Sequence, residues 1–170
     1  MQDSDLLLTI AEVAVAFAGF ASLVSILGQR SARVDFYVSS VRMRAMVLYS
    51  LLVVAFALFP FVFNRYGLRD EAVWRVSSAL FAIAVVAVEV WLIRRVIQLH
   101  ALSRRTRPVL VIVIPTLSVA SVTLLANATI VPSSLTAAVY LTGLGLLLFL
   151  AGLVFALILF SFLAGVDSDE

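Results

Sequence analysis

The sequence predicts an all-α fold: a polytopic integral membrane bundle of five transmembrane helices in one domain, with the N-terminus outside and the C-terminus inside. Three observations lead to this prediction, namely the apolar composition, five long apolar runs and the distribution of arginine. Of the 170 residues, 64% are hydrophobic and 13% are charged, whereas soluble domains have about 45–50% apolar and about 25% charged residues. A small soluble domain cannot bury this excess, so the composition excludes soluble enzymes, nucleic-acid-binding domains and disordered tails.

Five apolar runs match or approach the roughly 20 residues that a helix needs to cross the hydrocarbon core. They are residues 6–28, 45–63, 76–93, 109–131 and 135–164. Polar or turn-forming residues separate them, and Pro132 stops the fourth run because proline cannot continue a helix. The fifth run would be about 45 Å long as a helix, which exceeds a core of about 30 Å. We expect it to project from the membrane, to bend near Gly143 and Gly145, or to pack against another subunit above the lipid.

The connections between the runs differ in arginine content. Residues 29–44 carry four arginines and residues 94–108 carry five, against three in residues 64–75 and none in 132–134. Because positively charged loops stay in the cytoplasm, the first and third connections are predicted to be cytoplasmic. All the positive charges are arginine, and guanidinium groups bind phosphate in a bidentate manner. Anionic lipid head groups are therefore expected partners of these connections, although a GC-rich genome would also explain the absence of lysine.

Residues that most catalytic and metal sites require are rare in this chain. It has no cysteine and one histidine, His100, which lies near several arginines. Thiolate catalysis and cysteine-ligated metals are therefore excluded, and we expect no metal site and no cofactor. Four serines in the apolar runs are expected to bond to their own helix backbone: Ser77, Ser78, Ser118 and Ser121. Without a hydrolase motif or a long loop, the protein is predicted not to be an enzyme and to have no nucleic-acid partner.

The first apolar run contains one charged residue, Glu12, which is the main candidate for a functional site. A carboxylate in hydrocarbon is costly, so it is usually paired, protonated or turned toward water. Helical spacing places Thr9 on the same face, within a stripe formed by Asp5, Thr9, Glu12, Ala16 and Gly19. Asn127 and Arg75 are expected at a similar depth. Two interpretations stay open: Glu12 is a structural group that is protonated or bonded to Asn127, or these polar residues line a path for cations or protons.

A second carboxylate, Glu89, lies about one turn from the cytoplasmic end of the third run. Four arginines are expected at the same level of the membrane and are its candidate ion-pair partners: Arg42, Arg44, Arg94 and Arg95. Such a pair would fix the second and third helices to each other.

Small residues mark the helix faces that are expected to pack closely, because they allow backbones to approach. In the first run they recur at three- or four-residue steps and include Ala14, Ala18 and Ser22. The fifth run has a weaker pattern that includes Gly145 and Gly152. We expect these two helices to supply the closest packing, within one chain or between subunits. In the fourth run, Pro115 is expected to kink the helix and is a candidate hinge.

Two stretches resemble segments of small multi-pass bacterial membrane proteins with no assigned function. They are residues 11–20, AEVAVAFAGF, and residues 140–153, YLTGLGLLLFLAGL. The similarity would cover most of the chain, and it implies a location in the bacterial inner membrane. Small and apolar residues dominate both stretches, so the resemblance implies no activity and no site.

Two functions of different classes fit these patterns. The first is a homo-oligomeric ion or proton channel or carrier with Glu12 lining the path, which explains an intramembrane carboxylate on a polar stripe. The second is a non-catalytic accessory or structural subunit of a larger membrane assembly, which explains the lack of a soluble domain and of a catalytic motif. Both functions require partners in the membrane, either further copies of the chain or other membrane subunits.

Overall fold

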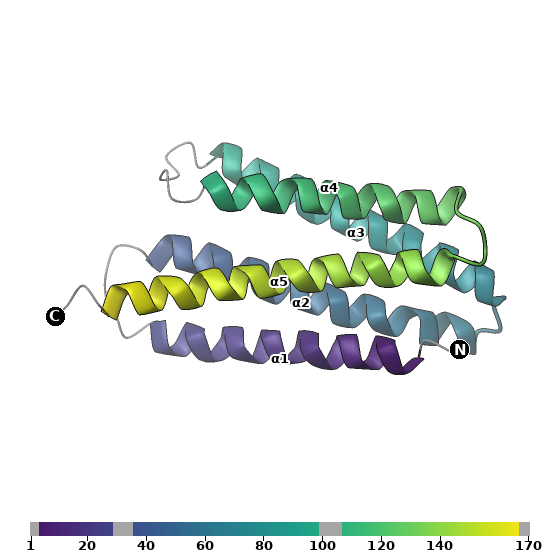
Figure 1. The fold of residues 1–170 in the computed structure, drawn as a ribbon, viewed down its shortest axis with the longest axis horizontal. Coiled ribbons are helices and arrows are strands. Elements are labelled where there is room, and N and C mark those ends of the chain that lie inside the picture. Colours follow the sequence, from purple (N-terminus) through teal and green to yellow (C-terminus); the bar gives the residue numbers. More distant parts are fainter. Residues whose placement is uncertain (1–3, 29–35, 99–106, 167–170) are drawn as a thin grey trace. The chain divides into compact units, whose positions relative to one another are not determined.

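The computed structural model describes the backbone of residues 4–28, 36–98 and 107–166 and the side chains of residues 4–23, 44–94 and 111–160. Five helices occupy these residues (Figure 1). They are α1 (Ser4–Gly28), α2 (Phe36–Arg65), α3 (Asp70–Gln98), α4 (Arg107–Thr129) and α5 (Thr136–Val166). No strand occurs in the part of the chain that is described, so the predicted all-α class is confirmed.

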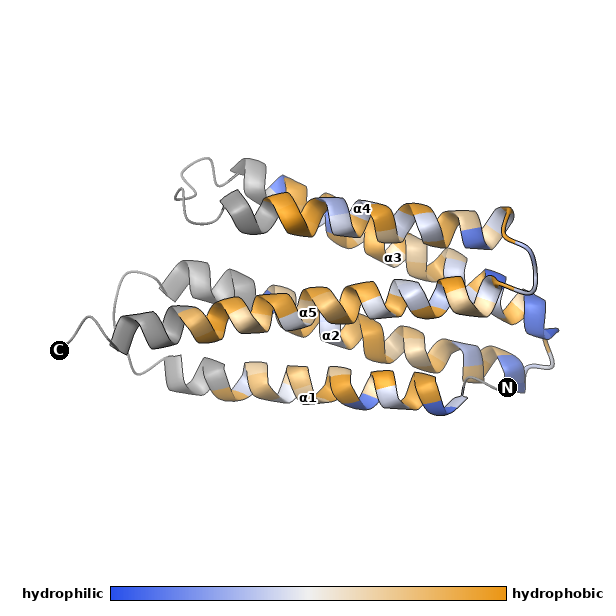
Figure 2. Ribbon diagram, in the orientation of Figure 1, coloured by the Kyte–Doolittle hydropathy of each residue, from blue (hydrophilic) through white to orange (hydrophobic). Residues whose placement is uncertain are grey.

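All five helices are long and apolar enough to cross a membrane. Their candidate spans are Ser4–Leu23, Arg44–Arg65, Asp70–Arg94, Val111–Thr129 and Thr136–Phe160. Figure 2 shows apolar residues dominating along the helices, with most hydrophilic residues near the helix ends. At about 1.5 Å per residue, even the shortest of these spans approaches the thickness of the hydrocarbon core, about 30 Å. The chain therefore has the five membrane-spanning helices that its composition predicts, and the direction in which they cross stays a prediction.

α2 and α3 extend beyond both ends of the predicted apolar runs, because polar residues join their first and last turns. α4 ends at Thr129, two residues before the end of its predicted run. α3 begins at Asp70, and its first turn carries Asp70 and Glu71, where negative charge interacts favourably with the helix dipole. Gly67 stands in the turn between α2 and α3 with a φ of 74°, a conformation that glycine adopts without strain. α5 is helical from Thr136 to Val166 and continues through Gly143 and Gly145.

The chain packs as two compact units. The first unit comprises Met1–Ala57 and Leu147–Glu170, and the second comprises Leu58–Leu146. α2 and α5 therefore contribute one part to each unit.

In the first unit, α1 packs against the second part of α5. The buried face of α1 is made of Leu7, Ala11, Ala14 and Ala21. The rings of Phe17 and Phe20 each lie 5.8 Å, between centroids, from the ring of Phe155 on α5. Small residues at the centre of the α1 face and aromatic rings beside it thus join these helices within one chain.

In the second unit, α3 and α4 run antiparallel and side by side (Figure 1). The first part of α5 packs against both. The Tyr140 ring lies 5.6 Å from that of Trp74 and 5.8 Å from that of Phe81, both on α3. On the α4 side, a Cβ atom at Gly143 would lie 2.9 Å from Leu124 Cδ2. Among the described residues of this unit, the buried polar side chains are Ser77, Ser78, Ser121, Asn127 and Thr136.

Candidate functional site

The polar stripe predicted on α1 lies on the exposed side of that helix. All its members are exposed: Asp5, Thr9, Glu12, Ala16 and Gly19. No atom lies within 4 Å of the position that a Cβ atom would take at Gly19. Glu12 follows Ser4 by about two helical turns, about 12 Å along the axis, and lies in the N-terminal half of α1, inside the candidate span. The stripe is therefore an outward surface of the first unit with a carboxylate inside the span.

Exposed hydroxyl groups in the spans are hydrogen-bonded to their own helices. Thr9 Oγ1 donates to the Asp5 carbonyl oxygen at 2.8 Å, and Ser22 Oγ donates to that of Ala18 at 3.1 Å. The same bond to the carbonyl four residues earlier is made by Thr116, Thr123, Thr129 and Thr142. Such hydroxyls can face lipid without leaving a donor unpaired. Thr9, a predicted path residue, therefore has its proton engaged by its own helix.

Glu12 differs from these hydroxyls. It makes no hydrogen bond or ion pair with the described residues of the first unit. A carboxylate has no proton to donate to a carbonyl oxygen of its own helix, as a threonine hydroxyl does. Facing hydrocarbon is therefore costly for it. An ionised Glu12 therefore requires a polar environment from outside its unit.

The small residues that were predicted to pack closely differ in how deeply they are buried. Ala14 is fully buried, Ala18 is half-buried and Ser22 is exposed. A Cβ atom at Gly152 would lie 3.5 Å from Phe17 Cζ, so this glycine lies against α1. Gly145 is exposed and has open space where its Cβ atom would be, so packing at Gly145 by another subunit stays a prediction.

Asn127 is fully buried and joins three helices of the second unit. Its Nδ2 donates to Ser78 Oγ on α3 at 2.7 Å and to the carbonyl oxygen of Thr136, the first residue of α5, at 2.8 Å. Both amide protons are therefore used inside this unit, which leaves none for a carboxylate. The prediction that Asn127 and Glu12 share one path stays untested.

Glu89 accepts a hydrogen bond from Ser118 Oγ at 2.5 Å, which joins α3 to α4. Among its predicted arginine partners, Arg44 and Arg94 are exposed, whereas the side chains of Arg42 and Arg95 lie outside the described residues. The predicted ion pair therefore stays a prediction.

Three of the four serines depart from the expectation that they bond to their own helix backbone. Ser77 Oγ is buried and has no hydrogen-bond partner among the described residues. Ser121 Oγ does donate to its own helix, at the Ser118 carbonyl oxygen. Ser78 and Ser118, however, bond to side chains of a neighbouring helix. Sequence reasoning missed both roles. Aligning α3 and α4 as antiparallel neighbours would have placed Ser78 opposite Asn127 and Ser118 opposite Glu89.

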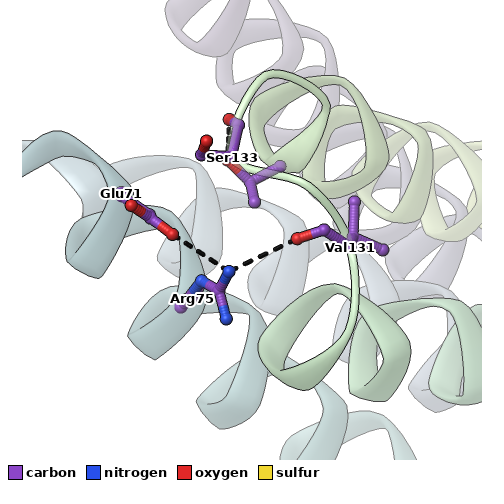
Figure 3. Close-up of polar contacts among 5 residues, drawn as sticks. Glu71, Arg75, Val131 and Ser133 are labelled. Carbon is purple, nitrogen blue, oxygen red and sulfur yellow. Dashed lines mark hydrogen bonds and ion pairs between the residues drawn. The ribbon is translucent and has the colours of Figure 1, made fainter.

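Arg75, considered above as a partner of Glu12, ties the α4–α5 turn to α3 (Figure 3). One terminal guanidinium nitrogen lies 2.9 Å from a Glu71 carboxylate oxygen and donates to the Val131 carbonyl oxygen at 3.4 Å. The turn is also closed internally, because Thr136 Oγ1 donates to the Ser133 carbonyl oxygen at 2.9 Å. The α4–α5 turn is therefore stabilised by a hydrogen bond from α3 and by a hydrogen bond within the turn itself.

Pro115 is exposed and lies inside α4, which continues through it as a helix; its role as a hinge stays a prediction. Over the described residues, no three His, Cys, Asp or Glu side chains are grouped so that they could hold a metal ion.

No protein-family model, no curated protein and no solved structure matches the chain. Two groups of polar residues distinguish the spans: the exposed stripe around Glu12 in the first unit and the buried polar cluster around Asn127 in the second.

Proposed function

We propose that this membrane protein is a homo-oligomeric channel or carrier for protons or small cations, and that Glu12 lines its path. The observation that supports the proposal is the position of Glu12, which is exposed inside the candidate span and has no partner among the described residues of its unit. Because hydrocarbon is a costly environment for a carboxylate, the surface around an ionised Glu12 must meet water or other protein.

Copies of the chain can supply that environment. Ala16 and Gly19 are exposed on the same face as Glu12, and such small residues allow a neighbouring helix to come close. Packing of α1 against equivalent helices would bring several Glu12 carboxylates around one axis. Rings of carboxylates attract cations in channels, so the same arrangement would both satisfy Glu12 and select positive charge.

The orientation and the location belong to this proposal. The arginine-rich connections favour an N-terminus outside and a C-terminus inside, with arginines at the anionic head groups of the cytoplasmic leaflet. The resemblance described above favours a bacterial inner membrane. Glu12, in the N-terminal half of α1, would then lie toward the outer side of the path.

Flux measurements in liposomes test the role of Glu12. We expect vesicles that contain the purified protein to conduct protons or small cations, as measured with a pH-sensitive dye and a cation-selective electrode. Glu12→Gln removes the charge with little change in shape and is expected to reduce the flux to that of protein-free vesicles.

Asp5→Asn is the matched control, because Asp5 is an exposed carboxylate of the same stripe in the first turn of α1, where water reaches it. This variant is expected to retain most of the flux. Wild-type flux in a folded Glu12→Gln protein would contradict the proposal.

An accessory subunit is the second candidate, because a different membrane protein could also cover the stripe around Glu12. Native mass spectrometry after gentle extraction from the native membrane separates the two. A discrete homo-oligomer supports the channel or carrier, whereas a stoichiometric complex with other chains supports the accessory subunit.

A further inference from the structure

Glu12 is surrounded on the exposed face of α1 by side chains that are mostly apolar. Residues three and four positions away share its face of the helix, and all of them are exposed: Leu8, Thr9, Val15 and Ala16. Thr9 is the one polar member, and its hydroxyl proton is donated to the Asp5 carbonyl oxygen. One carboxyl group and one neutral hydroxyl oxygen are therefore the ligands that this part of α1 offers to an ion.

The exposed face stays apolar from Glu12 to the last described side chain of α1. Ala16, Gly19 and Leu23 follow on the same face and are exposed. Ser22 is exposed as well, but its hydroxyl proton is donated to the Ala18 carbonyl oxygen. Glu12 and Leu23 are about 16 Å apart along the helix axis, and no charged residue lies between them in the sequence.

The other helices of the first unit add no acidic ligand to their described spans. In α2, the described side chains of this unit belong to residues 44–57, and Arg44 is the only charged residue among them. Residues 147–160 of α5 contain no charged residue. Apart from Asp5 in the first turn of α1, Glu12 is therefore the only acidic side chain in the described part of this unit.

A metal cation and a proton make different demands on such a surface. A metal cation that leaves bulk water has to replace its hydration shell with several oxygen ligands, about six to eight for Ca²⁺, as rings of carbonyl groups do for K⁺. A ring of Glu12 carboxylates would supply ligands at one level, and the exposed face of α1 offers none of comparable strength over the next 16 Å or so. A proton needs one ligand, and a carboxyl group that binds it becomes neutral. Apolar surroundings are far less costly for a neutral group than for a charge.

We infer that Glu12 is a proton-binding site inside the membrane, and that the proton, not a metal cation, is the ion of the proposed path. The Glu12 carboxylate takes up one proton to become a carboxylic acid and releases it to become the carboxylate again. No other bond forms or breaks. Beyond Glu12, a single file of water would relay a proton from one molecule to the next, whereas a metal cation would find no charged ligand there. This inference rests on the proposed function, because it names the substrate of that path.

Flux measurements with two separate gradients test the substrate in vesicles that contain the full chain. In the first assay, a pH gradient is followed with a pH-sensitive dye while valinomycin and K⁺ balance the charge. In the second, a Na⁺ or K⁺ gradient at equal pH is followed with a cation-selective electrode while a protonophore balances the charge. We expect the wild type to exceed Glu12→Gln several-fold in the first assay and to equal it in the second.

Glu12→Asp keeps a carboxyl group and is expected to retain part of the proton flux, because one carboxyl group is enough to bind a proton. A Na⁺ or K⁺ flux that depends on Glu12 would overturn the inference and leave the proposed function standing.

A lipophilic carbodiimide distinguishes failure of this inference from failure of the proposed function, because it needs no transport. It adds to a protonated carboxyl group, whose proton moves to a carbodiimide nitrogen, and the adduct rearranges to a stable N-acylurea. Mass spectrometry of the labelled chain and its peptides is expected to locate this adduct at Glu12, and to find none at position 12 in Glu12→Gln. Asp5, in the first turn of α1, is the internal control and is expected to react much less.

The two readouts together decide each case. Vesicles that conduct no ion would contradict the proposed function, and an adduct at Glu12 would then still support proton binding at this residue. The absence of both the adduct and a Glu12-dependent proton flux would overturn the inference.

Discussion

At the scale of single residues, polar groups in these spans are satisfied in two ways. Hydroxyls on exposed faces bond to their own helix, as Ser22 does at the Ala18 carbonyl oxygen. Hydroxyls on packed faces bond to a neighbouring helix, as Ser118 does at Glu89. Only the second kind contributes to the stability of the packed helices, so the two serines should respond differently to the same substitution.

Ser118→Ala is expected to destabilise the folded protein by about 1 kcal/mol, the scale of interhelical hydrogen bonds in membrane proteins. Ser22→Ala is the matched control and is expected to change the free energy of unfolding by less than about 0.5 kcal/mol, as is typical of exposed sites. Unfolding in mixed micelles measures both. A double-mutant cycle with Glu89→Ala, which removes the acceptor, isolates the pair, and a coupling energy near zero would argue against this hydrogen bond.

At the scale of helices, two glycines of α5 have different surroundings: Gly143 packs closely against another helix, and Gly145 lies on an open surface. A Cβ atom at Gly143 would lie 2.9 Å from Leu124 Cδ2, whereas nothing lies within 4 Å of the same position at Gly145. The sequence pattern selected Gly145 and overlooked Gly143, because helical spacing assigns residues to a common face without saying which face meets another helix.

Gly143→Ala and Gly145→Ala test this difference within one helix. Alanine favours the helix over glycine by about 1 kcal/mol, but overpacking against Leu124 is expected to cost about 1–3 kcal/mol. Gly143→Ala should therefore lower the free energy of unfolding, and Gly145→Ala should raise it in the isolated monomer. Equal effects of the two substitutions would contradict the packing at Gly143. Weaker oligomers with Gly145→Ala would indicate that another subunit covers that surface.

At the scale of the whole molecule, the arginine distribution predicts the direction in which the spans cross. The chain has no cysteine, so single cysteines can be placed and labelled without background. Tyr66 and Ser134 are exposed in the α2–α3 and α4–α5 connections, and Ser103 belongs to the arginine-rich connection between α3 and α4. A membrane-impermeant maleimide is expected to label Tyr66→Cys and Ser134→Cys in intact cells and Ser103→Cys only after lysis. The reverse pattern would show the opposite orientation.

Composition and run length were enough to predict five membrane-spanning helices, because a bilayer imposes a minimum apolar length on each span. They did not predict the partners of the polar residues. Ser78 and Ser118 have the same local sequence signals as serines that bond to their own helix, and only the antiparallel register of α3 and α4 places Asn127 and Glu89 opposite them. The polar stripe of α1 was visible in the sequence because it depends on the spacing within one helix.

The contact between Arg75 and Val131 joins a side chain to the main chain. Every amino acid supplies a carbonyl oxygen, so the acceptor persists when the residue at position 131 changes, provided that the turn keeps its backbone path. The donor at position 75 is a side chain, and only arginine offers this guanidinium group, so a substitution there removes the donor. Substitutions at position 131 should therefore preserve this contact, whereas substitutions at position 75 should remove it.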